Sequence, residues 1–242
     1  QTALEIASRA GGDRGCLGLY GPATPPGPQK PERLIVLETA GWSILDDGSK
    51  SAFEGLLESL RRAGITLLRR RDNILVEALE EAIAEANAIA GAITRWENRW
   101  AHRNLVDQKA EFVSDRLKAG LALAEAMSPD DYRAALTARA AAQHCHATVA
   151  PLADAAITLS CPGPAPLWPG DIQGEPLAAR PTGDAIFNTP SSMLFAPCVT
   201  MPLMAVGGLP LGAQMMGQQH QDARMTAIAR WILQNISPIV VG

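Results

Sequence analysis

The 242-residue sequence has no excess of basic residues, no long apolar run and no closely spaced pair of cysteines. Asp and Glu number 25 against 21 Lys and Arg, which gives a formal net charge of −4. A chain of this charge lacks the positive surface that holds a nucleic-acid backbone. Its apolar runs fall short of the roughly 20 residues of a membrane-spanning helix. We therefore expect no nucleic-acid partner and no membrane partner.

Cysteine chemistry is equally sparse. Cys16, Cys145, Cys161 and Cys198 are scattered without a C-x-x-C spacing, and a chain with 47% hydrophobic residues does not need disulfides to hold its core. Free thiols in a cytoplasmic protein are the expectation. The run "HCH" at residues 144–146 resembles a metal cluster, but a zinc site needs three or four converging ligands. We interpret it as a polar helix end and expect neither a metal nor a cofactor.

The hydrophobic content and a mean hydropathy of +0.03 are typical of one large or two small globular domains. The basic run "RRR" at residues 69–71 follows an apolar segment, where we expect solvated charge at a strand end rather than an anion site. The opening "QTALEIASRAGG" is typical of the last turns of a helix closed by Gly11 and Gly12. We expect the chain to begin inside a larger protein.

A strand, a helix and a second strand are indicated after a proline-rich connector. "RLIVLE" at residues 33–38 is a short apolar run, and "ITLLRR" at residues 65–70 is another. Between them, apolar residues recur at helical spacing, at Phe53, Leu56, Leu57 and Leu60. This order is typical of a βαβ unit with parallel strands. We predict an α/β fold, in which helices cover a mixed β-sheet.

A helical insertion between strands is expected at residues 73–146, where apolar residues continue at helical spacing. Ser128 followed by Pro129 is a strong helix start within it. Trp96 and Trp100 lie one turn apart and share a helix face. We expect this face to pack into a core, with a ligand-binding wall as the less favoured interpretation.

The last part of the chain begins with a loop at residues 161–181, which is too rich in proline for regular structure. Trp168 within it is either a pocket lid or a loop anchor. "CVTMPL" and "GGLPLGAQMMG" then predict two strands joined at a Gly-Gly turn. A helix starting near Asp222 and a short strand in "ISPIVVG" complete the predicted elements.

These last motifs follow one another in a specific order: an Asn and a Pro before a strand, a Gly-Leu-Pro turn, glycines in and after the next strand, and an Asp at a helix start. The matching residues are Asn188, Pro190, Pro197, Gly208 to Pro210, Gly212, Gly217 and Asp222. The order resembles the C-terminal end of the amidase signature family of serine hydrolases. "ASRAGGDRGCLGLYGP" near the start is similar to the stretch that follows the family's catalytic region.

The resemblance covers most of the chain and is weakest across the helical insertion. It implies that residues 1–242 are the C-terminal portion of a single amidase-type domain. Residues 182–242 would then complete the sheet and form a wall of the substrate pocket.

The resemblance also implies a Ser, cis-Ser, Lys triad that hydrolyses small carboxylic amides. In the family, these residues lie N-terminal to the part that is matched, and the sequence has no Gly-Gly-Ser-Ser-like motif. The nearest imitation, "DDGSK" at residues 46–50, lacks the glycine run and is typical of a helix start. We therefore assign no catalytic residue to this chain, which alone should be inactive.

Adjacent serines in "TGDAIFNTPSSMLFAPCVTMPL" suggest a nucleophile, but no glycine flanks them and no lysine is near. We expect instead that a loop entering a central strand places four residues along the substrate pocket: Phe187, Asn188, Ser191 and Ser192. The equally favoured alternative is that they only cap and turn that loop.

Three functions stay open. The chain is part of an amidase, with a small amide as substrate and the N-terminal half of the same protein as partner. Alternatively, it is a non-catalytic binding or interaction domain with the same fold. The third is an amidotransferase A-type subunit, from which it departs around Asp184 and Ala185. A homo-oligomer also stays open.

Overall fold

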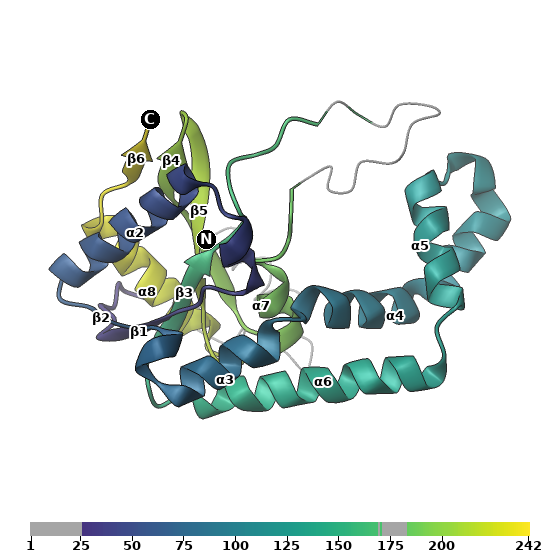
Figure 1. Cartoon of the computed structure of the whole chain (residues 1–242), viewed down its shortest axis with the longest axis horizontal. Helices are drawn as coiled ribbons and strands as arrows, with labels where there is room; N and C mark the ends of the chain where they lie inside the picture. Colours follow the sequence, from purple (N-terminus) through teal and green to yellow (C-terminus); the bar gives the residue numbers. More distant parts are fainter. Residues whose placement is uncertain (1–25, 169, 171–182) are drawn as a thin grey trace.

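In the part of the chain that the structure describes, six strands form one sheet with helices packed around it (Figure 1). The computed structural model describes residues 26–168, 170 and 183–242, so the predicted helical stub, Cys16 and most of the proline-rich loop lie outside the described residues. The strand order is β2-β1-β3-β5-β4-β6. The strands are β1 (Arg33–Val36), β2 (Thr66–Leu68), β3 (Ala155–Leu159), β4 (Cys198–Val206), β5 (Leu209–Met216) and β6 (Ile239–Val241).

The sheet is mixed, as predicted. Strand β1 pairs in parallel with both β2 and β3, and β4 pairs in parallel with β6. Strand β5 lies antiparallel between β3 and β4. The parallel pairing of β1 with β2 across the helix between them confirms the predicted βαβ unit.

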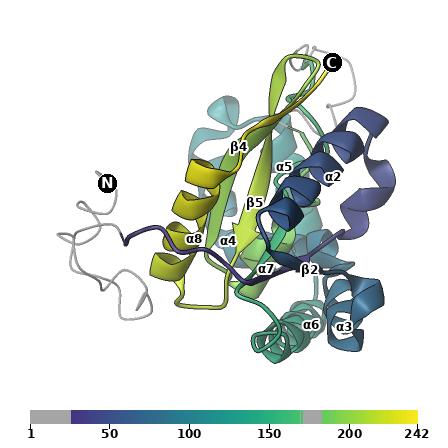
Figure 2. The ribbon, with the colours of Figure 1, turned by 90° about the vertical axis from the view of Figure 1, so that its left-hand side faces the viewer.

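Helices α2 (Asp47–Arg62) and α8 (Asp222–Asn235) cover one face of the sheet (Figure 2). Helix α2 begins where Asp46 Oδ1 accepts a hydrogen bond from the Ser49 backbone N–H, at 2.6 Å. Its apolar stripe is buried at the predicted spacing, so α2 packs as an amphipathic helix. The stripe and the side chains from α8 share one core, which includes Phe53, Leu56, Leu57, Leu60, Met225, Ile228 and Ile232.

Helices α3 (Ile74–Ile83), α6 (Pro129–Thr148) and α7 (Thr189–Leu194) cover part of the opposite face. Alternate residues of a strand point to opposite faces of a sheet. Ile35, Ala156 and Met216 therefore face this second layer, where they are buried with Leu79 and Ile83 of α3. The sheet thus lies between two hydrophobic layers.

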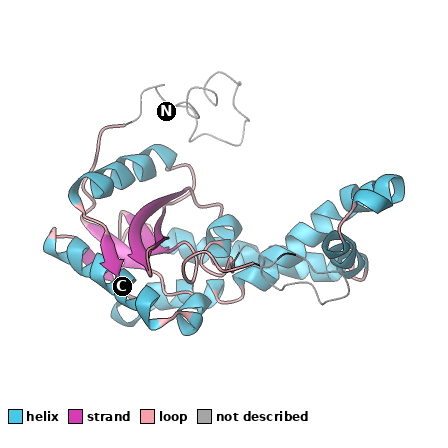
Figure 3. Cartoon of the chain, turned by 90° about the horizontal axis from the view of Figure 1, so that it is seen from above, coloured by secondary structure: helices cyan, strands magenta, loops and turns pink. Residues whose placement is uncertain are grey.

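The predicted helical segment lies between β2 and β3. Helices α4 (Ala86–Lys109) and α5 (Asp115–Glu125) form an arm that projects away from the sheet (Figures 1 and 3). Ser128 starts α6 as predicted, because its Oγ accepts a hydrogen bond from the Asp131 backbone N–H at 3.1 Å. Short 3-10 turns complete the described elements, at η2 (Ala40–Ile44), η3 (Arg70–Asp72) and η4 (Ala110–Phe112).

The expected core packing of the two tryptophans on α4 is wrong for Trp100, which is 71% exposed. Trp96 stacks on Tyr132 of α6 with ring centroids 5.4 Å apart, and the Arg99 guanidinium lies 3.5 Å from the centre of the Trp96 ring. The sequence pattern was misleading because α4 runs beyond the sheet, where this helix face meets no hydrophobic layer.

Strands β4 and β5 form the predicted hairpin. Gly207 and Gly208 join them with φ angles of 56° and 78°. Two successive positive φ angles are characteristic of the tight turns that match the twist of a hairpin, and glycine adopts them without steric cost. Among the residues that the structure describes, no helix has the length and apolar character needed to cross a membrane.

Candidate functional site

An open cavity of about 580 Å³ lies where β3 ends, against the β4–β5 hairpin. Its size is within the range of small-molecule pockets. Strands β4 and β5, the beginning of the proline-rich loop directly after β3, and residues 183 and 184 form its walls. The described lining consists of Ser160, Cys161, Pro162, Gly163, Pro164, Ala165, Pro166, Gly183, Asp184, Thr200, Pro202, Pro210 and Gly212.

The floor of the cavity is formed by residues from neighbouring strands that point to the same face of the sheet. Ser160 follows β3, Gly212 lies on β5 and Thr200 lies on β4, and all three face the layer opposite α2 and α8. A Cβ at Gly212 would lie 2.6 Å from Ser160 Oγ and 2.7 Å from Thr200 Cγ2. Glycine at this position therefore allows two hydroxyl side chains from the flanking strands to converge.

Two polar side chains of the lining already donate their hydrogens within the chain. Ser160 Oγ donates to the Gly212 carbonyl at 3.1 Å, and Cys161 Sγ donates to the Gly163 carbonyl at 3.1 Å. Proline has no N–H group to donate, and five prolines line the cavity. This wall is suited to shaping an apolar or weakly polar ligand rather than to activating a nucleophile.

The four predicted site residues lie at and beside helix α7, and none is part of the described lining of the cavity. Phe187 is 1% exposed, and its carbonyl accepts a hydrogen bond from Gln214 Nε2 at 3.5 Å. Asn188 and Ser192 are exposed, whereas Ser191 is buried. Gln214 follows Gly212 by two positions on β5, so its side chain points to the same face of the sheet and meets the Phe187 carbonyl there.

The two serines lie on a short helix and not on the expected loop. Pro190 occupies the first turn of α7, where its missing N–H costs nothing. Phe195 ends the helix with a left-handed backbone, at φ 53°. Ser191 Oγ donates to the Asn188 carbonyl at 2.7 Å. The structure thus brings Asn188 and Ser191 together as a local helix-start contact, and their role toward a substrate stays a prediction.

A contributor that sequence reasoning missed is the start of α2. Asp46 and Ser49 form the expected N-terminal cap, and Ser49 Oγ donates to Asp46 Oδ2 at 3.1 Å. A Cβ at Gly163 would lie 3.4 Å from Asp46 Oδ2 and 3.5 Å from Ser49 Oγ. The cap therefore lies beside the cavity loop, at a distance that would allow ordinary van der Waals contact with a side chain at position 163.

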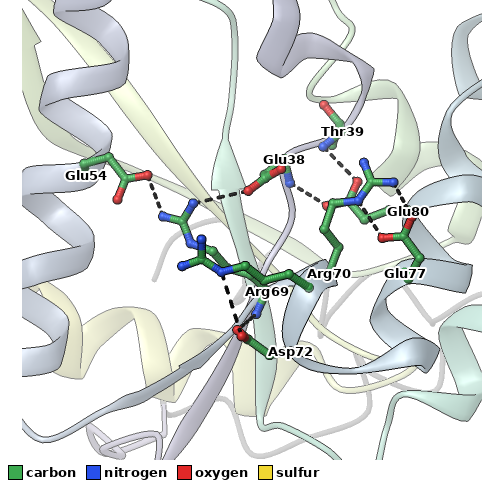
Figure 4. Close-up of polar contacts among 9 residues, drawn as sticks. Glu38, Thr39, Glu54, Arg69, Arg70, Asp72, Glu77 and Glu80 are labelled. Atoms are coloured by element: carbon green, nitrogen blue, oxygen red, sulfur yellow. Dashed lines mark hydrogen bonds and ion pairs between the residues drawn. The ribbon is translucent and has the colours of Figure 1, made fainter.

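Arg69 and Arg70 of the basic run after β2 are paired rather than solvated, contrary to the sequence-based expectation (Figure 4). Arg71 is solvated as expected, since its side chain is 78% exposed. The Arg69 side chain is 11% exposed and contacts Glu38 at 3.2 Å and also Glu54. Arg70 binds both carboxylate oxygens of Glu77. These arginines crosslink β1, α2 and α3 and do not form an anion site.

The "HCH" run lies near the end of α6, at a helix end as expected. His144 is exposed, but His146 is buried at 3% exposure rather than in a polar setting. Burial lowers the pKa of the His146 imidazole to about 4, because a charged ring is disfavoured away from water. Within the described ranges, no group of three His, Cys, Asp or Glu side chains could hold a metal ion.

Comparisons with known proteins identify the fold. No family model and no curated protein matches the chain. An amidase crystal structure superposes with a TM-score of 0.72 at 21% identity, over 88% of this chain and 47% of that one. A bacterial aryl acylamidase of the amidase signature family superposes with a TM-score of 0.67 at 12% identity, over 85% and 44%.

A third structure is the A-type subunit of a glutamyl-tRNA(Gln) amidotransferase from Thermotoga maritima. It superposes with a TM-score of 0.54 at 23% identity, over 85% of this chain and 42% of that one. The chain therefore has the α/β fold of amidase signature enzymes, which confirms the expected resemblance in fold. It spans less than half the length of these solved structures.

Proposed function

We propose that this chain is the C-terminal half of an amidase that hydrolyses a small carboxylic amide. The observation that carries the proposal is the cavity of about 580 Å³, which opens on a sheet with the fold of amidase signature enzymes. The chain covers under half of those enzymes, so the cavity is one wall of a pocket that another segment of the same protein completes.

The chemistry is divided between the two parts. The other segment supplies the Ser, cis-Ser, Lys triad, which must deprotonate a serine and stabilise a developing oxyanion. Ser160 and Cys161 already donate their hydrogens to backbone carbonyls. We therefore assign the cavity wall of this chain to orienting the amide and not to activating a nucleophile. Fixing the orientation of a substrate contributes to rate without direct participation in bond breaking.

The predicted residues around α7 belong to the same proposal. Asn188 and Ser192 are exposed, and we assign them to the part of the pocket that forms when the other segment is present. Phe187 and Ser191 are buried and support that surface from behind. In this proposal, residues 73–146 are an insertion and residues 182–242 complete the sheet.

The proposed partners are a small amide and the N-terminal half of the same protein, and self-association into a homo-oligomer is compatible with them. A cytoplasmic location is part of the proposal, supported by the free thiols of Cys145, Cys161 and Cys198. An amidotransferase subunit is the second candidate, supported by the similarity to the Thermotoga maritima subunit.

The test is an assay of the chain with and without the segment that its gene encodes upstream, using simple aliphatic and aryl amides and glutamine. We expect hydrolysis by the longer protein and none by the chain alone. Turnover by the chain alone would contradict the placement of the triad. An inactive longer protein that still binds the amides would favour the binding domain, and activity confined to glutamine would favour the amidotransferase.

A pair of variants tests the role of the cavity. Thr200 lines the cavity, and Thr200→Phe in the longer protein should fill part of it and raise KM about tenfold or more, since a misplaced substrate loses binding contacts. Thr137→Phe, at an exposed position of α6, is the matched control and should leave KM unchanged. Equal effects of the two variants would contradict the assignment of the cavity.

A further inference from the structure

Thr39 has a backbone conformation that a β-branched residue rarely adopts. Its φ is 56° and its ψ is 177°, in a region that is populated mainly by glycine. It stands directly after Glu38, two positions beyond the end of β1, and begins the turn η2. A strained residue persists only where its surroundings hold it in place.

The side chain that holds this turn is Glu80 of α3 (Figure 4). One carboxylate oxygen accepts a hydrogen bond from the Glu38 backbone N–H at 2.6 Å, and the other accepts one from the Thr39 backbone N–H at 2.9 Å. The Glu80 side chain is almost fully buried, at 3% exposure. Burial raises the pKa of the Glu80 carboxyl, and the two N–H donors oppose that rise. A buried carboxylate is costly unless donors satisfy both of its oxygens, as they do in this case.

Neighbouring ion pairs fix both partners of this contact. Arg69 binds the Glu38 side chain and links it to Glu54 of α2. Arg70 binds Glu77, which precedes Glu80 by one turn on α3. The carboxylate and the turn are therefore each anchored to a different helix.

The turn packs against Phe187 and leads toward the cavity wall. Gly41 lies against the Phe187 ring, where a Cβ would come within 2.5 Å of a ring carbon. Trp42 contacts Phe53 of α2 edge to face, with ring centroids 6.2 Å apart. The turn then leads into Asp46, the cap residue that lies beside Gly163 in the cavity wall.

We propose that Glu80 is a positioning residue: its carboxylate holds Thr39 in the strained conformation and so fixes the turn that packs against Phe187 and leads into the cap beside the cavity loop at Gly163. Glu80 does not touch a substrate and acts only through this turn. Its influence on a reaction rests on the proposed amidase function, whereas its influence on the shape of the cavity does not.

The experiment uses thiols that the chain already contains. Cys161 lines the cavity, and its Sγ is bound to the Gly163 carbonyl. Cys145 lies on α6 against the hydrophobic layer of α3. Alkylation of the folded chain by iodoacetamide, followed peptide by peptide with mass spectrometry, reports separately on the cavity loop and on that layer.

Glu80→Gln should raise the alkylation rate of Cys161 about tenfold and leave that of Cys145 within about twofold, because the glutamine amide sets an N–H donor against one of the two backbone N–H groups. Glu81→Gln, at an exposed position of the same helix, is the matched control and should change neither rate. If Glu80→Gln does not fold, Glu80→Asp withdraws the carboxylate by one methylene and should give the same pattern.

A rescue variant separates positioning from general stabilisation. Glycine adopts a positive φ without strain, so in the Thr39→Gly background Glu80→Gln should change the Cys161 rate by less than about threefold. Equal acceleration at Cys145 and Cys161, or an undiminished effect in the Thr39→Gly background, would overturn the proposal. Both readouts are independent of catalysis, so an inactive protein would not affect the result.

Discussion

Acidification should destabilise the chain through the buried imidazole of His146. The unperturbed pKa of 6.5 falls to about 4 in the folded state, because the ring is 3% exposed. The folded-state pKa lies below the unfolded value, so this contribution to stability is complete above pH 6.5 and is lost as the pH falls toward 4. The unfolded chain takes up the proton first and is thereby favoured.

The size of the effect follows from the two pKa values. The interval from 6.5 to about 4 corresponds to about 3 kcal/mol, at roughly 1.4 kcal/mol for each tenfold change in the proton-binding constant. In a chain of this length, such a loss lowers the melting temperature by about 6 to 12 °C. Carboxyl groups also titrate in this range, so the imidazole must be isolated by comparison with a variant.

Urea unfolding, followed by tryptophan fluorescence, gives the free energy of unfolding of the chain and of His146→Gln at several pH values. The difference between them should narrow by about 3 kcal/mol between about pH 7.5 and pH 4. His144→Gln, two positions away and exposed, should follow the unmodified chain throughout. A difference that stays constant with pH would refute the claim that burial controls the charge of this ring.

Three further substitutions test packing and local structure by the same unfolding measurement. Phe187→Ala should lower the free energy of unfolding by about 3 to 5 kcal/mol, because its ring is 1% exposed. Asn188→Ala should lower it by less than about 0.5 kcal/mol and should alter KM in the longer protein. A larger loss of stability for Asn188→Ala than for Phe187→Ala would contradict the assignment. Gly212→Ala should lower the free energy of unfolding by about 1 to 3 kcal/mol, because the added methyl group would clash with Ser160. An unchanged free energy of unfolding would show that β5 and its neighbours can move apart to accept the methyl group. Ser128→Ala should cost about 1 kcal/mol by removing the cap of α6, and no loss would mean that the cap is redundant.

Local patterns predicted most of the fold. The βαβ unit, the Gly207-Gly208 hairpin and the Ser128 cap depend on residues that are close in sequence, and in each case backbone geometry or a short-range hydrogen bond decides the structure. The position of α2 was similarly evident, since its buried stripe repeats once per turn. The fold class followed from the order of these elements.

The cavity could not be predicted in the same way, because its walls come from distant parts of the chain. Ser160, Gly212 and Thr200 meet only when β3, β5 and β4 are aligned in register. The pairing of Arg69 and the exposure of Trp100 were missed for the same reason, since each depends on which element lies opposite. A side chain's environment is a property of the tertiary structure, and one sequence shows only its near neighbours.

The arrangement of the sheet has a consequence for the order of folding. The β4–β5 hairpin closes through two residues and can form early, whereas the pairing of β1 with β3 must close the long segment between them, since Leu34 pairs with Ala155. Pairings between distant segments carry a large loop-closure entropy and slow the search for the native state. In pulsed hydrogen exchange during refolding, the amides of β4 and β5 should become protected before those of β1.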